Sequence, residues 1–132
     1  MENSSNILQV KNLSISFRSE EGTNEVLHRV TFDVGKGEIL GLVGESGSGK
    51  SVSSMAIMGL LPSTAMTTEG EMILHLKGQE SINIVGLAEA KHRGLRGKHI
   101  SMIFQEPMTS LNPIQKCGEQ VAEILQIHQN IG

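Results

Sequence analysis

Residues 38–51, which read EILGLVGESGSGKS, decide the fold. A short apolar run at residues 39–43 stops at Gly44, and after four intervening residues Gly49-Lys50-Ser51 opens a helical pattern. This is the spacing of a phosphate-binding P-loop. The apolar run predicts a strand before the loop, and the residues after Ser51 predict a helix behind it, which is the context that the motif requires.

The residue types in this loop suit an anion. Glycines permit backbone angles and a close approach that a Cβ would prevent, so successive N–H groups can point at one phosphate. The N-terminal amides and dipole of the following helix favour the same charge. Lys50 is expected to reach the β- and γ-phosphates, and the Ser51 hydroxyl to ligate Mg²⁺. A glycine-rich turn that binds nothing is the alternative.

The composition fits one globular domain or part of one. The 132 residues include 15 glycines and three phenylalanines but no tryptophan or tyrosine, which is typical of a mixed α/β protein with an aliphatic core. The net charge of −3 argues against a general nucleic-acid coating role, which needs many clustered cations. One basic cluster lacks interleaved aromatics, so a solvated face is favoured over a nucleic-acid patch; it comprises Lys91, Arg93, Arg96 and Lys98.

The cysteine, the histidines and the apolar stretches bear on compartment, metal binding and membrane spanning. Cys117 is the single cysteine, so a disulfide within the chain is excluded and a reducing compartment is indicated. The five histidines show no metal-ligand spacing. No apolar stretch approaches the roughly 20 residues that a membrane span needs. If the protein acts at a membrane, we therefore expect it to bind peripherally rather than to span the bilayer.

Hydrophobic periodicity predicts the order of elements. Alternation predicts a half-buried strand in which Leu13, Ile15 and Phe17 face the core while Ser14 and Ser16 face away. Similar patterns predict further strands at residues 30–34, 72–76 and 82–84, a strand covered on both faces at 100–104, a loop at 18–24, helices at 52–60, 87–95 and 121–128, and an irregular loop at 105–113. Phe17 could stack on an adenine ring, although a core or edge phenylalanine is the alternative.

Over essentially all of its length the sequence resembles the ATP-binding subunits of ABC transporters. Residues 44–51 match the Walker A motif, Phe17 falls where the adenine-stacking aromatic of that family lies, and FQEP at 104–107 matches the Q-loop. The longer string MIFQEPMTSLNP at 102–113, together with GESGSGKS at 44–51 and MGLL at 58–61, resembles the importer group for oligopeptides, dipeptides, nickel and glutathione.

The resemblance implies roles for the site residues. Lys50 and Ser51 would hold phosphate and Mg²⁺, while Gln105 would contact the Mg²⁺ and the attacking water and relay the nucleotide state to a membrane partner. Val52 stands where relatives have threonine, so a side-chain contact to the α-phosphate is lost but its backbone N–H remains. The implied ATP- and Mg²⁺-binding set is Phe17, Gly44, Glu45, Ser46, Gly47, Ser48, Gly49, Lys50, Ser51, Val52 and Gln105.

The resemblance also implies an α/β fold: a P-loop NTPase core with an antiparallel β subdomain, truncated at the start of a helical subdomain. The whole chain, residues 1–132, would be a partial nucleotide-binding domain. Within it, residues 1–104 would form the β subdomain and P-loop core, 105–113 the Q-loop, and 114–132 the start of the helical subdomain.

Other parts of the hydrolytic machinery are missing from this sequence. Phosphoryl transfer needs an acidic residue at the end of a second apolar strand and a group that orients water. Asp33 is the only aspartate, and it precedes the P-loop in an alternating strand. There is no Ser-Gly-Gly-Gln signature and no following switch histidine. We therefore expect the amino-terminal part of a longer protein, marginal in stability and inactive as an ATPase by itself.

The leading hypothesis is an ATP hydrolase subunit that powers an ABC importer for peptides or a related small solute. Its expected partners are integral-membrane permease subunits, a second ABC ATPase subunit and, indirectly, a solute-binding protein, with no nucleic acid. It would lie peripherally on the cytoplasmic side of the cell membrane. The alternatives are a soluble ABC-type ATPase of DNA repair or translation, and a non-catalytic fragment that only binds nucleotide or binds nothing.

Overall fold

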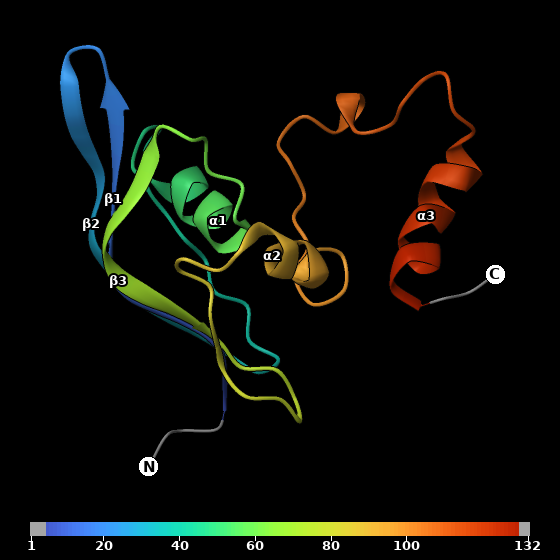
Figure 1. Cartoon of the computed structure of the whole chain (residues 1–132), viewed down its shortest axis with the longest axis horizontal. Helices are drawn as coiled ribbons and strands as arrows, with labels where there is room; N and C mark the ends of the chain where they lie inside the picture. Colours follow the sequence, from blue (N-terminus) through green and yellow to red (C-terminus); the bar gives the residue numbers. More distant parts are fainter. Residues whose placement is uncertain (1–4, 130–132) are drawn as a thin grey trace. The chain divides into compact units, whose positions relative to one another are not determined.

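The structure, a computed structural model, describes residues 5–129 and divides the chain into two compact units, residues 1–92 and 93–132. The first unit is built on an antiparallel sheet with the strand order β2-β1-β3-β4. The strands are β1 (Asn6–Ser19), β2 (Gly22–Gly35), β3 (Ala65–Leu74) and β4 (Ile82–Asn83). Figure 1 shows β1 between its two long neighbours, so the central strand is also the first in the chain.

The β1–β2 hairpin confirms two predicted strands, but the predicted loop at 18–24 is wrong. β1 continues to Ser19 and β2 starts at Gly22, with Phe17 paired to Asn24 near the tip. Residues 18–25 are exposed. Because backbone ladder bonds hold this end of the hairpin, its strands can pair without the apolar alternation on which the prediction relied.

The prediction that Ser14 and Ser16 face away from the core is also wrong. Both side chains are buried, with 2% and 6% of their surface exposed, as are the neighbouring Leu13 and Ile15. At the centre of β1, therefore, side chains on both faces of the sheet are buried. The Ser14 hydroxyl is used there, since its Oγ accepts a hydrogen bond from the Arg29 N–H at 3.0 Å.

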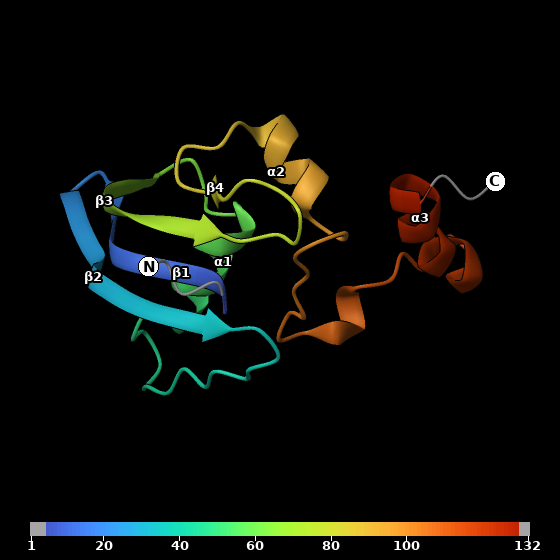
Figure 2. The same ribbon diagram turned by 90° about the horizontal axis from the view of Figure 1, so that it is seen from below.

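A row of bulges bends the sheet where these residues meet. Asn12 and Arg29 have positive φ values of 49° and 45°, and Gly70 on β3 has a φ of 97°. The pairing register of β1 shifts beside all three residues. Thr31 Oγ1 accepts a hydrogen bond from the Asn12 N–H at 2.9 Å, so side chains replace ladder bonds that the bulges remove. Figures 1 and 2 show the resulting curvature of β1 and β2.

Helix α1 (Lys50–Met58) packs on one face of this curved sheet, as Figure 2 shows. It buries Ser53, Ala56 and Met58, and Gly59 ends it in a left-handed conformation. The helix predicted at 52–60 is thus confirmed within two residues. The apolar core of the unit comprises Val10, Leu13, Ile15, Leu27, Ala56, Met58, Met72, Leu74 and Ile84.

Two predicted strands are wrong. Residues 39–43 form no strand, and the side chains of Ile39 and Val43 are 97% and 98% exposed. Residues 100–104 make only an isolated bridge between Arg96 and Ile100, and Ile103 is 96% exposed. An apolar strand covered on both faces needs neighbouring strands and covering layers. Within residues 5–129 neither segment has them.

The strand predicted at 72–76 is confirmed only in part, because β3 starts at Ala65 and ends at Leu74, while the remaining elements follow the predictions. The helices expected at 87–95 and 121–128 are confirmed as α2 (Glu89–Leu95) and α3 (Cys117–Gln129), with a 3-10 turn η1 (Pro107–Thr109) in the irregular loop. In the second unit, the Gln120 side chain accepts a hydrogen bond from the Asn112 N–H at 2.8 Å and ties this loop to α3. None of the described helices is both long and apolar enough to cross a membrane.

Candidate functional site

The glycine-rich loop and the start of α1 form the candidate site in the first unit. Gly47 and Gly49 have φ values of 81° and 92°, which L-side chains rarely adopt. Between them, the Ser48 N–H donates to the Glu45 carbonyl oxygen at 3.1 Å. The predicted P-loop residues are therefore folded back on one another as a turn, and Gly49 delivers the chain directly into the helix as its N-cap.

Lys50 bridges the two ends of this loop. Its ammonium group donates to the carbonyl oxygen of Gly44, to that of Glu45 at 2.8 Å and to Ser48 Oγ at 3.1 Å. The loop thus brings one cation and several backbone groups into a small volume. Because carbonyl oxygens are neutral acceptors, the positive charge of Lys50 is not cancelled by these contacts.

The N-terminus of α1 is open to an anion. No side chain caps it, and no acidic residue lies in its first turn. Its first intrahelical bond runs from the Ser53 N–H to the Gly49 oxygen at 2.9 Å, so the amides of Lys50, Ser51 and Val52 have no acceptor within the helix. Ser51 is exposed in this turn. Free amides, a helix dipole and a nearby ammonium group together favour negative charge, and the Ser51 hydroxyl offers an oxygen ligand to a hard cation.

Close packing fixes the loop against the sheet. A Cβ at Gly44 would lie 2.5 Å from Ser48 Oγ, and one at Gly49 would overlap the Leu27 side chain. A cavity of about 150 Å³ lies where the loop meets β2, between Ser48, Gly49 and Lys50 on one side and Leu27 and Phe32 on the other. The loop is therefore supported by β2.

Sequence reasoning missed the part that Leu27 plays. A strict alternation from Val30 and Phe32 would place residue 28 rather than 27 on the same face. The bulge at Arg29 shifts the phase, so Leu27 is buried beside the loop while His28 is exposed. A positive φ at an arginine has no clear sequence pattern, and the shift could not be read from periodicity alone.

Two other predicted site residues lie elsewhere in the chain. Phe17 is half-buried in β1, where it pairs with Asn24 and Ala65. Gln105 belongs to the second unit and is exposed. The predicted contacts of Phe17 with adenine and of Gln105 with Mg²⁺ and water stay predictions.

Comparison with known proteins bears on the family. A model of the ABC transporter family matches residues 27–131. The chain is 46% identical over 126 residues to the oligopeptide transport ATP-binding protein OppD of Bacillus subtilis, and 45% identical over 122 residues to the dipeptide transport ATP-binding protein DppD of Lactococcus lactis. These alignments cover 95% and 92% of the chain and 34% of each relative.

A third relative, the glutathione import ATP-binding protein GsiA of Pectobacterium atrosepticum, is 40% identical over 126 residues, which is 95% of the chain and 20% of that protein. The chain therefore spans about a third or less of the length of these relatives. The family match extends over most of the chain, and it includes the loop, α1 and the segment at 105–113. This chain belongs to the ABC transporter family.

Proposed function

We propose that residues 44–52 bind Mg-ATP. The observation that carries this proposal is the glycine loop that leads into the uncapped N-terminus of α1, with the Lys50 ammonium group held over the same loop. Backbone amides and one lysine form the donor set that suits a polyphosphate. The membership of the chain in a P-loop ATPase family supports the choice of ATP.

Each residue would contribute in a distinct way. The loop amides would hold the β-phosphate region, and Lys50 would exchange carbonyl oxygens for phosphate oxygens. Ser51 would supply a hydroxyl ligand to Mg²⁺, which when bound neutralises phosphate charge. The Val52 N–H would face the α-phosphate, Phe17 would stack on adenine, and Gln105 would position the water.

We propose further that the protein is the ATP-hydrolysing subunit of an importer for peptides or a related small solute. The names of the relatives, which are ATP-binding proteins of oligopeptide, dipeptide and glutathione transport, support this cargo class. Integral-membrane permeases, a second ATPase subunit and indirectly a solute-binding protein would be its partners, and it would lie peripherally on the cytoplasmic side. Residues 1–104 would be the core, 105–113 the Q-loop and 114–132 the start of a helical subdomain.

Nucleotide binding can be tested with the Lys50→Ala variant. A fluorescent ATP analogue titrated into the chain should bind about tenfold or more weakly to this variant, because the phosphates lose a charged donor. Lys98→Ala, which removes an exposed lysine from the second unit, is the matched control and should bind as the unaltered chain does. Equal affinities for the Lys50→Ala variant and the unaltered chain would contradict the placement of phosphate at this loop.

The transport assignment can be tested by purification from native membranes. A tagged full-length protein that contains this chain should co-purify with a polytopic membrane protein after mild detergent extraction. The same tag on an unrelated cytosolic ATPase is the control. Recovery of nucleic acid in place of a membrane protein would instead support the DNA-repair or translation ATPase.

A further inference from the structure

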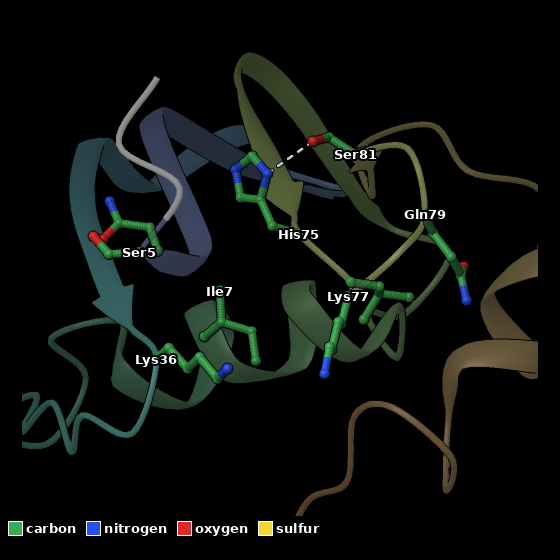
Figure 3. A pocket seen from close by; sticks show the side chains of 9 residues that line it. Ser5, Ile7, Lys36, His75, Lys77, Gln79 and Ser81 are labelled. Carbon is green, nitrogen blue, oxygen red and sulfur yellow. Dashed lines mark hydrogen bonds between the residues drawn. The ribbon is translucent and has the colours of Figure 1, made fainter. Parts of the chain in front are cut away.

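A second pocket lies at the end of the sheet where β1 begins. It has a volume of about 340 Å³ and is shown in Figure 3. Three segments supply its lining: the start of β1, the residue that follows β2, and the connection from β3 to β4. The lining residues are Ser5, Asn6, Ile7, Lys36, His75, Leu76, Lys77, Gln79 and Ser81, and none of them belongs to the loop at 44–51.

Sheet topology places the two lysines of this pocket on opposite sides of Ile7. β1 lies between β2 and β3, so the chain leaving β2 reaches one side of Ile7 and the chain leaving β3 reaches the other. Backbone bonds fix both sides: the Lys36 N–H donates to the Ser5 oxygen at 2.7 Å, and the His75 N–H donates to the Ile7 oxygen at 2.9 Å. Figure 3 shows the Ile7 side chain between those of Lys36 and Lys77.

His75 holds one wall of the pocket in place. Its Nδ1 lies 2.7 Å from Ser81 Oγ, and its Nε2 lies 3.0 Å from Gln9 Oε1. The Gln9 amide oxygen only accepts, so Nε2 donates in the first contact, and the Ser81 hydroxyl is the partner of Nδ1. The ring therefore joins the β3–β4 connection to β1, which limits how far this wall can move.

The lysine and carboxylate content of the pocket lining favours an anion. The lining contains two ammonium groups and no carboxylate. Within residues 5–129, neither Lys36 nor Lys77 belongs to any of the ion pairs, whereas Lys11 and Lys116 each have a glutamate partner. Ile7 and Leu76 add apolar surface to the lining. This combination of a few polar groups with apolar walls is what small-molecule sites use.

We propose that this pocket binds a small organic anion, whose carboxylate or phosphate group contacts the ammonium group of Lys36 or Lys77 and whose apolar part rests on Ile7 and Leu76. A volume of about 340 Å³ lies at the small end of the range for ligand sites, which suits a small ligand. The site is separate from the proposed ATP site and does not depend on it.

The proposal can be tested with benzoate and phenyl phosphate as probes. Titration of each into the isotope-labelled chain should shift the NMR resonances of Ile7, His75 and Lys77 with saturation, and a stronger effect of one probe would identify the headgroup. Benzyl alcohol, the uncharged counterpart, should bind at least about tenfold more weakly, because it lacks the charge-assisted contacts. Equal shifts with benzyl alcohol would overturn the proposal.

Variants of the two lysines test whether probe binding depends on their charge or on the shape of the pocket. The double variant Lys36→Met and Lys77→Met keeps the aliphatic length and should reduce probe affinity by at least about tenfold, whereas Lys36→Arg with Lys77→Arg should retain it. Lys91→Met, which alters an exposed lysine on α2, is the control and should bind the probes normally. Unchanged affinity in the double methionine variant would also overturn the proposal. Binding of the ATP analogue should be the same in all of these variants.

Discussion

At the scale of single residues, two separate structural reasons require a glycine at position 49. Its φ of 92° lies in the left-handed region, and a Cβ at this position would overlap the Leu27 side chain beneath the loop. Both requirements concern a residue that the sequence pattern assigns to phosphate binding. The structure therefore adds a packing reason to a chemical one, and only the chemical one was predictable, because the contact with Leu27 depends on a bulge in β2.

We expect Gly49→Ala to lower the free energy of unfolding by about 2–4 kcal/mol, since left-handed strain and steric overlap add. Gly94→Ala is the matched control: a Cβ there meets nothing within 4 Å, its φ is not positive, and alanine favours the helix. Urea unfolding of the two variants measures the difference. If both variants unfolded at the same urea concentration, the packing described for Gly49 would be wrong.

At the scale of elements, periodicity predicted which segments form structure better than it predicted how they pair. Residues 8–17, 30–34 and 72–74 are strands, and 52–58 is a helix, as expected. The apolar run at 39–43 and the one at 100–104 have the composition of strands, but pairing is a property of two segments. Within residues 5–129 no partner strand lies beside either of them, so composition alone gave the wrong answer.

The bulge row offers a test at this scale. Ser14→Ala removes the Oγ that accepts the Arg29 N–H, in a place where only 2% of the serine is exposed. Leaving that amide without its partner should lower the free energy of unfolding by about 1–3 kcal/mol. Ser19→Ala, at the exposed tip of the hairpin, should change it by less than about 0.5 kcal/mol. Chemical denaturation compares the two variants, and equal stabilities would show that the hydroxyl does not support the bulge.

At the scale of the whole molecule, the sequence predicted the family and the proposed phosphate site because both depend on contiguous motifs. Both units also expose apolar side chains. In the first unit Ile39 and Val43 are almost fully exposed, and in the second the apolar residues of α3 are exposed as well: Val121, Ile124, Leu125 and Ile127. A surface of this kind is typical of segments that contact other protein.

The 132-residue chain is expected to show no appreciable ATP hydrolysis. Its only aspartate, Asp33, lies in β2 opposite Gln9 and is bonded to the Asn6 side chain at 3.2 Å, so it is unsuited to hold Mg²⁺ at the loop. Phosphate release from ATP by the purified chain should equal that of the buffer blank. Turnover that disappears in the Lys50→Ala variant would contradict this expectation.

The contacts of Lys50 bear on the conformational entropy that its side chain would lose when a ligand binds. A long lysine side chain normally loses rotational freedom when it meets a phosphate, and that entropy loss weakens binding. Here the ammonium group already rests on the Glu45 oxygen and Ser48 Oγ. A polyphosphate at the proposed site would therefore meet an ammonium group that is already held beside the loop, and it would have to replace these oxygen partners.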